Sequence, residues 1–347
     1  MDIGNKIKQL RLHAGMTQEQ LATKLGISAQ SVSKWETAVT MPDITLLPIL
    51  AGELGVSIDD LFDLTAEQKF HRIERRMDIE EEFTEQTFAE YESFLRNHLE
   101  EDKENCRILS LLAHLYHHRM TSDSRKVSHY ARKAILLKPE AKDCQWLLQK
   151  AEGATCWDWN IANHSAVIDF YKKVIEADTI TPKSPMPYYE VMDNLLADHR
   201  AKEAEEYLAI YRTLPAHRPF LVPVYEAYIA LAEYDGKKAD AIMEEAEARF
   251  GDDKGFLFEK GQYHARKCDY EKAIAYYERS WVNDRQPRYT DALHGIATIY
   301  EILGNKEKAI ETYDRMIACI KEEWGYVDGD AAVIEVERDR NRLLSEL

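Results

Sequence analysis

The polar side chains best suited to chemistry near the start of the chain share one side of a predicted helix. Ser28 is a suitable N-cap for a helix over residues 29–37, and Val32 and Trp35 lie on the apolar side of that helix. The polar residues that point elsewhere are Gln30, Ser33 and Lys34. The helix therefore keeps a polar face while its other face can pack against a core.

Motifs that would indicate catalysis or metal binding are missing from the sequence. It contains no G-x-S-x-G, no Walker loop, no H-E-x-x-H and no closely spaced pair of cysteines. His114 and His118 stand four residues apart, but no Glu follows His114, so a metal site there is not favoured. The five cysteines lie far apart and are expected to be buried free thiols. We expect neither an enzyme nor a bound metal or cofactor.

Two further amphipathic helices are predicted before the polar helix. Apolar residues recur at steps of three and four, at Ile3, Ile7 and Leu10 and again at Leu21, Ala22 and Leu25. Thr17 and Gln20 have the form of a capping box for the second of these helices, and Gly26 ends it. Together with the turn at Gly26 and the polar helix, the second of these helices makes a two-helix unit. In such a unit the polar helix can enter the major groove of DNA while the helix before it meets the backbone. Two more short helices close this core, over residues 43–54 and 57–62.

These residues resemble the Cro and phage-repressor type (XRE family) of helix-turn-helix over residues 3–64. The resemblance rests on T-Q-E-Q-L-A-x-x-L-G-I-S-x-x-x-V-S-K-W-E, followed by P-D-x-x-x-L-x-x-L-A. The family usually has Gly shortly after W-E, whereas this chain has Ala38. This departure leaves open a different exit from the polar helix, because Ala disfavours left-handed backbone conformations.

The resemblance implies double-stranded DNA as a partner and assigns roles to six residues. Gln18, at the start of its helix, would bind a phosphate. The positions that would face base edges are Ser28, Ala29, Gln30, Ser33 and Lys34. Gln30 could pair with adenine and Lys34 could reach guanine or a phosphate, while Ala29 could touch a thymine methyl. The competing interpretation is a small helical protein-interaction domain in which these polar side chains are only hydrated.

Charge is distributed unevenly along the chain. The net charge of the 347 residues is −17, yet residues 1–40 carry five basic against three acidic side chains, a net charge of +2. The N-terminal segment is thus compatible with DNA, and the acidity lies elsewhere. No apolar run approaches the roughly 18 residues that a membrane-spanning helix needs, and the start of the chain does not have the form of a signal peptide. A cytoplasmic protein without a membrane partner is expected.

Residues 65–82 are predicted to form a solvated connector helix between two domains. Basic residues come first, at His71, Arg72, Arg75 and Arg76, and acidic residues follow, at Asp78, Glu80, Glu81 and Glu82. Contact of the basic part with DNA phosphates is a second interpretation. The predicted domains are therefore residues 1–64 and residues 83–347.

Small residues repeat at a nearly fixed period in the second domain, most clearly over residues 220–320. Ala227, Ala239 and Ala246 recur 34 residues later as Gly261, Ala273 and Ser280, and 36 residues after that as Ala297, Ala309 and Met316. Small residues let two helices cross closely, which predicts an all-α solenoid of at least five helix pairs. The spacing resembles tetratricopeptide repeats, as in G-Q-Y-H-A-R-K-x-D-Y-E-K-A-I-A-Y-Y.

The concave face of such a solenoid suits an extended peptide or a partner helix. The side chains predicted to face inward are Tyr189, Asp193, Asn194, Tyr228, Phe258, Gln262, Arg266, His294 and Thr298. Their amides can bond a peptide backbone and their aromatic rings can cover apolar side chains. A separate cluster of interest contains Trp157, Trp159, Asn160 and Asn163, and core packing is favoured for the two tryptophans.

The two predicted domains together resemble Gram-positive peptide-pheromone regulators of the Rgg, PlcR, PrgX and NprR types. That resemblance implies a transcriptional regulator whose repeat domain dimerises and binds a short regulatory peptide. Dimerisation would place two recognition helices about 34 Å apart on a palindromic operator. Two alternatives stay open: a repeat domain that serves only as a dimerisation or protein-partner scaffold, and a phosphorelay-interacting protein.

Overall fold

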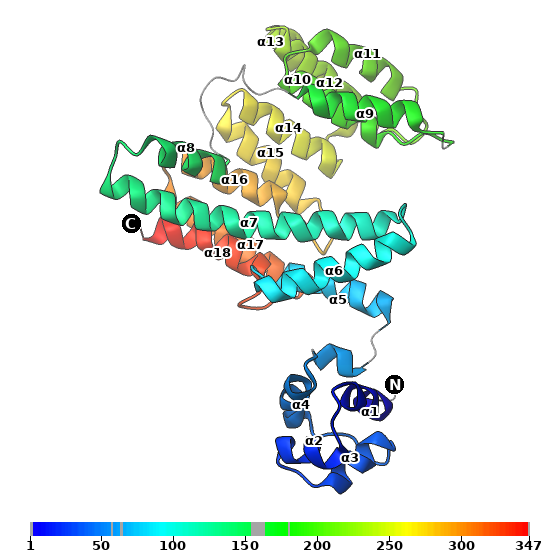
Figure 1. The fold of residues 1–347 in the computed structure, drawn as a ribbon. Coiled ribbons are helices and arrows are strands. Elements are labelled where there is room, and N and C mark those ends of the chain that lie inside the picture. Colours follow the sequence, from blue (N-terminus) through cyan, green and yellow to red (C-terminus); the bar gives the residue numbers. More distant parts are fainter. Residues whose placement is uncertain (1–2, 57, 63–64, 154–163, 180, 346–347) are drawn as a thin grey trace. The chain divides into compact units, whose positions relative to one another are not determined.

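The computed structural model describes residues 3–56, 58–62, 65–153, 164–179 and 181–345. All regular secondary structure in these ranges is helical, which confirms the predicted all-α fold (Figure 1). The chain divides into two compact units, Met1–Arg119 and Met120–Leu347. Among the described helices, none combines the length and the apolar composition needed to cross a lipid bilayer.

The first core is built from short helices that the sequence marks clearly. Their bounds are α1 Ile3–His13, α2 Gln18–Leu25, α3 Ala29–Glu36, a 3-10 turn Ile44–Leu46, α4 Leu47–Leu54 and a second 3-10 turn Ile58–Phe62. The capping box at α2 is complete, since the Gln20 N–H donates to Thr17 Oγ1 and the Thr17 N–H donates to Gln20 Oε1. Gly26 ends α2 in the left-handed conformation, with φ of 67°.

Close approach of α1 and α3 fixes the angle at which α3 is presented. A Cβ atom added to Gly4 would lie 1.9 Å from the carbonyl oxygen of Trp35, so only glycine fits there. Val32 and Trp35 are buried in the same core, as predicted from their spacing. α3 is therefore held by its apolar side and by backbone contact with α1.

Residues 65–82 do not form a solvated connector, because their helix belongs to a second apolar core. α5 spans Ala66–Ile79, α6 spans Glu85–Glu101, and α7 spans Cys106–Leu137. The buried residues of this core are Phe70, Ile73, Phe83, Phe88, Leu95, Ile108, Leu111 and Leu115. The charge reversal lies on the exposed face of α5, whereas Phe70 and Ile73 form the apolar stripe on its buried face.

The repeat region consists of helix pairs in which small residues are buried where predicted. The bounds are α8 Lys142–Ala151, α9 Ser165–Ala177, α10 Met186–Ala197, α11 Ala201–Tyr211, α12 Leu221–Ala232, α13 Gly236–Phe250, α14 Lys254–Arg266, α15 Tyr270–Val282, α16 Asp291–Ile302, α17 Lys306–Trp324 and α18 Ala331–Leu344. Tyr277 of α15 fills the space between two glycines: a Cβ at Gly261 would lie 2.7 Å from its ring and a Cβ at Gly295 would lie 2.9 Å from it. The repeat thus depends on small residues opposite a large one.

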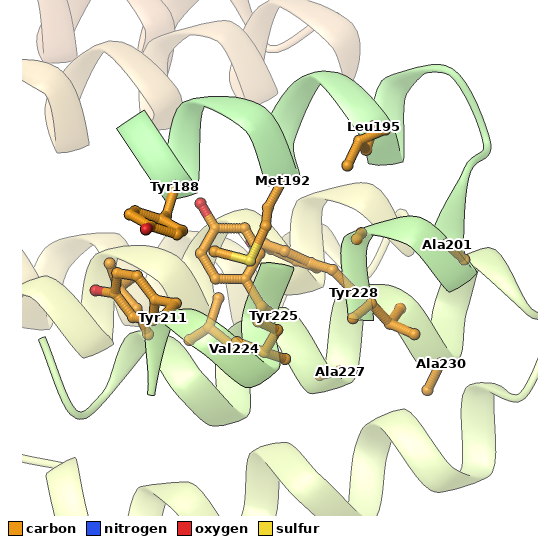
Figure 2. Packing of buried hydrophobic residues seen from close by; sticks show 14 of the residues in the cluster. Tyr188, Met192, Leu195, Ala201, Tyr211, Val224, Tyr225, Ala227, Tyr228 and Ala230 are labelled. Atoms are coloured by element: carbon orange, nitrogen blue, oxygen red, sulfur yellow. The ribbon is translucent and has the colours of Figure 1, made fainter. Parts of the chain in front are cut away.

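Four successive pairs, from α10–α11 to α16–α17, lie within the described residues. Tyr188, Met192, Tyr211 and Tyr225 belong to the core shared by the first pairs, and Figure 2 shows them gathered between the helices. The tryptophan and asparagine cluster predicted at residues 157–163 lies outside the described residues, and so does part of the predicted pair before α10.

The cysteine prediction needs correction. Of the described cysteines, Cys319 is buried, whereas Cys106 and Cys268 are exposed and Cys144 is intermediate, and all four are free thiols. Cys106 begins α7, and Cys268 lies between α14 and α15 with φ of 57°. Both lie at element ends, where burial does not follow from apolar character alone.

Candidate DNA interface and repeat groove

α3 presents a polar surface that is directed away from the first core. Gln30 and Lys34 are exposed, and Ser33 and Ala29 are half-buried. Ser28 serves as the N-cap, with its Oγ accepting from the Ser31 N–H at 3.2 Å. The predicted base-facing residues therefore occupy the start and the outer side of one helix.

A buried ion pair joins α1 to the end of α3. Arg11 Nε donates to Glu36 Oε1 at 2.6 Å and Arg11 Nη2 donates to Glu36 Oε2 at 2.9 Å. Arg11 Nη1 donates to the carbonyl oxygen of Met16 at 2.7 Å, in the turn before α2. Burial opposes ionisation of Glu36, but the hydrogen bonds from Arg11 and Gln18 outweigh it and lower the pKa of Glu36. Sequence patterns gave no signal for this pair, because its two residues are 25 positions apart.

Gln18 is tied to the same pair. Its Nε2 atom donates to Glu36 Oε2 at 2.8 Å. An amide nitrogen carries two hydrogens, so one N–H remains available beside the first turn of α2. The side chain is half-buried and oriented before any ligand arrives.

The chain adopts a left-handed backbone conformation just after the end of α3, although the residue there is not glycine. Ala38 has φ of 56°, and its N–H donates to the carbonyl oxygen of Trp35. The different exit that the sequence left open is therefore not adopted, since the helix-terminating hydrogen bonds outweigh the penalty on Ala.

This strain yields a stability prediction. Ala38→Gly should raise the free energy of unfolding of the first core by about 1 kcal/mol, because glycine adopts positive φ without a steric penalty. Hydrogen exchange of the α1–α3 amides in the full chain measures it. Gly26→Ala is the matched control in the opposite direction. Gly26 has φ of 67° and an added Cβ meets nothing within 4 Å, so this substitution should lower the free energy of unfolding by a similar amount. Equal protection in Ala38→Gly and the parent chain would contradict the prediction.

Among the hollows along the described part of the repeat region, two contain residues that were predicted to face inward. The first, here called the central groove, has a volume of about 460 Å³. It is lined by residues from α10, α12, α14, α15 and the start of α16, and from the segments before α12 and α16. Among its lining residues are Tyr189, Asp193, Arg218, Tyr225, Phe258, Glu259, Trp281 and Tyr289. The second, here called the C-terminal groove, has a volume of about 610 Å³ and is lined by residues from α14 to α18.

Five of the nine residues predicted to face inward line these grooves. Tyr189, Asp193 and Phe258 line the central groove, and Phe258, Gln262 and His294 line the C-terminal groove.

The other four lie elsewhere. Asn194 is half-buried, and its Nδ2 donates to the carbonyl oxygen of Glu190 at 2.8 Å. Tyr228 is 6% exposed and belongs to the core, while the guanidinium of Arg266 lies 4.3 Å from the centre of its ring. Thr298 is exposed on α16 and lines neither groove.

The repeat spacing missed several groove residues. Tyr225 comes one helical turn before Tyr228, and its hydroxyl donates to Asp193 Oδ1 at 2.9 Å. Trp281 and Tyr289 come from the end of α15 and the loop after it, which a rule based on first helices does not reach. Glu259 follows Phe258 directly, and the repeat period predicts only one inward residue at that turn.

Electrostatics distinguish the central groove. Burial raises the pKa of Asp193 above its usual range, although the hydroxyl of Tyr225 acts in the opposite direction. Burial and then the charge of Asp193 raise the pKa of Glu259. Lys254 pairs with Asp284 at the edge of the groove. Within the described part of the chain, no group of three or more His, Cys, Asp or Glu residues is arranged to hold a metal ion.

Matches to known protein families agree with the fold of the first core and with that of the repeat region. A model described as Helix-turn-helix matches residues 7–61, and one described as Tetratricopeptide repeat matches residues 290–318. The predicted DNA-binding fold and the predicted repeat type are thereby confirmed. The second match covers α16 and most of α17, where the sequence repeat is clear.

Individual proteins match mainly over the first core. The HTH-type transcriptional activator BcrR of Enterococcus faecalis is 38% identical over 61 residues, which are 18% of this chain and 30% of that protein. An HTH-type transcriptional regulator of Methanocaldococcus jannaschii is 40% identical over 58 residues, which are 17% of this chain and 88% of that protein. The chain thus spans less than a third of the activator but most of the second relative.

The structure of PlcR from Bacillus thuringiensis in complex with the peptide PapR7 and DNA covers 90% of this chain and 98% of its own, with 14% identity and a TM-score of 0.27.

Proposed function

The chain belongs to the helix-turn-helix family of transcriptional regulators, which are not enzymes, and we propose that α3 reads base edges in the major groove while α2 binds the DNA backbone. The observation that carries this proposal is the exposed polar side of α3. A buried ion pair holds the end of this helix against α1, so the polar side stays directed outward. Gln30 and Lys34 make the direct contacts to bases. Ala29 and Ser33 flank them, and Ser28 holds the start of the helix.

Gln18 positions the domain on the duplex. Its remaining amide N–H and the N–H groups of the first turn of α2 are suited to one phosphate. Because Glu36 already orients this side chain, little conformational entropy is lost on binding. Binding to chromosomal DNA would place the chain in the cytoplasm.

We further propose that the chain acts as a homodimer on a palindromic operator. Two recognition helices related by a two-fold axis read half-sites about 34 Å apart. The repeat region supplies the dimer contact and binds a short peptide in its grooves. Aromatic and amide groups in the grooves, such as Tyr189, Phe258 and Gln262, support a peptide ligand.

The second candidate is a repeat region that only recruits or pairs proteins. The net charge of −14 over residues 65–347 favours it, because a negatively charged scaffold is kept away from DNA. A phosphorelay-interacting protein is the third candidate, and no feature of the grooves favours it.

Binding selection on genome fragments tests the DNA proposal. The full chain should recover a recurring pair of half-sites at a stated salt concentration. Gln30→Ala with Lys34→Ala should lower the affinity for that site by about 30-fold or more, since each base contact contributes about 1–3 kcal/mol. Gln86→Ala with Lys103→Ala removes the same side-chain types from the surface of α6 and the turn after it, and should leave binding unchanged.

The outcomes separate the candidates. Loss of the site only in the α3 variant supports base reading by that helix. Recovery of a single half-site would contradict the dimer, and no enrichment by the parent chain would contradict DNA reading by the chain without an effector.

A further inference from the structure

The central groove combines aromatic walls with two carboxylates that form no salt bridge within the described part of the chain. Its aromatic lining includes Tyr189, Tyr225, Phe258, Trp281 and Tyr289. Asp193 and Glu259 lie in the same groove, on α10 and α14. Among the described residues, neither carboxylate takes part in a salt bridge.

The hydrogen bonds that these carboxylates accept come from neutral groups. The hydroxyl of Tyr225 donates to Asp193 Oδ1 at 2.9 Å, and that of Tyr228 donates to Glu259 Oε2 at 3.3 Å. Each bond fixes one oxygen and leaves the other free to accept from a ligand. Two tyrosines whose ring centres are 6.4 Å apart therefore hold two carboxylates toward one hollow.

The charges that line the groove do not balance. Four carboxylates line it, those of Asp193, Glu259, Asp284 and Asp291, against the two cations of Arg218 and Lys254. Lys254 is already paired with Asp284. The guanidinium of Arg266 lies over the ring of Tyr228 and forms no salt bridge with Asp193 or Glu259, but its charge lowers the pKa of both. Even with Arg266 counted, the carboxylates outnumber the cations. An excess of negative charge therefore remains in a partly desolvated space.

We infer that the central groove recognises an organic cation on a short peptide, with Asp193 and Glu259 as its counter-charges and the surrounding aromatic rings as its walls. This inference rests on the proposed peptide-binding function and specifies its ligand. A guanidinium or ammonium group satisfies both free carboxylate oxygens and also binds favourably against aromatic faces. Partial desolvation raises the pKa of each carboxylate, and a cation bound beside them would stabilise their charged forms.

A peptide can supply this cation from a side chain or from its amino terminus. Four pools of hexapeptides distinguish these sources. Three pools have blocked termini and a fixed third residue, which is arginine, lysine or citrulline; the fourth has citrulline and a free amino terminus. Citrulline keeps the shape of arginine without its charge, so the comparison isolates the cation.

Equilibrium dialysis against the full chain, with mass spectrometry of the retained peptides, gives the readout. The arginine and lysine pools should be retained about tenfold more than the blocked citrulline pool. If the amino terminus is the source, the fourth pool should show this preference instead. Asp193→Asn with Glu259→Gln should reduce the ratio to about one, since amides of the same shape keep the tyrosine hydrogen bonds.

A matched variant and a folding measurement complete the design. Glu245→Gln with Asp252→Asn removes the same charge from α13 and the loop after it, and should retain the tenfold preference. Circular dichroism melting of both double variants checks folding, and neutralising two repelling carboxylates should not lower the melting temperature.

Three outcomes of the dialysis experiment would contradict cation recognition by the central groove. Equal retention of all pools would overturn the inference but leave peptide binding in place. A preference that persists in the groove variant would place the cation elsewhere and overturn the inference as well. Retention of no pool would overturn the inference and the proposed peptide binding together, while the DNA selection still tests the first domain independently.

Discussion

Glu36→Ala should destabilise the first core by about 3–5 kcal/mol and abolish specific DNA binding. The substitution leaves the Arg11 guanidinium without its counter-charge, and the side chains of the two residues are only 8% and 2% exposed. An uncompensated buried charge of this kind has a cost in that range. Gln18 loses its acceptor at the same time, so its side chain at the start of α2 is no longer held in place. Urea unfolding and binding to the selected operator measure the two effects.

A paired replacement and an exposed ion pair serve as controls. Arg11→Met with Glu36→Leu should recover much of the lost stability, because an apolar pair has no desolvation penalty. It should not restore full affinity, since Gln18 remains without a partner. Glu53→Ala breaks the exposed pair with Lys24 and should change stability by no more than about 1 kcal/mol. Equal effects of Glu36→Ala and Glu53→Ala would show that the buried pair has no special role.

The same pair sets part of the acid sensitivity of the first core. The pKa of Glu36 is lower in the folded chain than its ordinary value of 4.5. Its contribution is therefore present above pH 4.5 and is lost as the pH falls through the lowered pKa. The variant without the pair should lose less stability over that interval than the parent chain.

Glu247→Gln should destabilise the repeat region by about 3 kcal/mol. Glu247 Oε2 accepts from Lys260 Nζ at 2.5 Å and from the Tyr276 hydroxyl at 2.8 Å, and Oε1 accepts from Arg279 Nη1 at 2.9 Å. One carboxylate of α13 thus joins α14 and α15. The Lys260 side chain is 4% exposed, so loss of the carboxylate leaves a buried ammonium without its counter-charge. Thermal unfolding of the full chain measures the effect.

The pH dependence gives an independent measure. Hydrogen bonds from Lys260, Arg279 and Tyr276 outweigh burial and lower the pKa of Glu247 to about 2, from an ordinary value of 4.5. Such a shift corresponds to about 3 kcal/mol, which is present above pH 4.5 and lost as the pH falls toward 2. The Glu247→Gln variant should lack this part of the acid transition.

Two controls accompany this prediction. Glu245→Gln, at an exposed position of the same helix, should change stability by no more than about 0.5 kcal/mol. Lys260→Met in the Glu247→Gln background should restore stability, because it removes the unpaired charge. A wild-type melting temperature in Glu247→Gln alone would refute the role assigned to the pair.

The sequence was sufficient to predict the short helices of the first core. Capping residues such as Thr17 and left-handed glycines such as Gly26 act within a few positions, so local patterns identify them. The period of small residues, including Ala239 and Ala273, predicted the repeat for the same reason, since each repeat contacts mainly its neighbours. The polar face of α3 also followed directly from helical spacing.

Tertiary structure alone decided which distant groups meet. Arg11 reaches Glu36 across 25 positions, and Glu247 gathers partners from two later helices. No local pattern encodes such encounters, because they depend on the angles at which helices pack. The central groove was decided in the same way. The inward period identified Asp193, but only the packing of α10 against α12, and of α12 against α14, brought it near Tyr225 and Glu259.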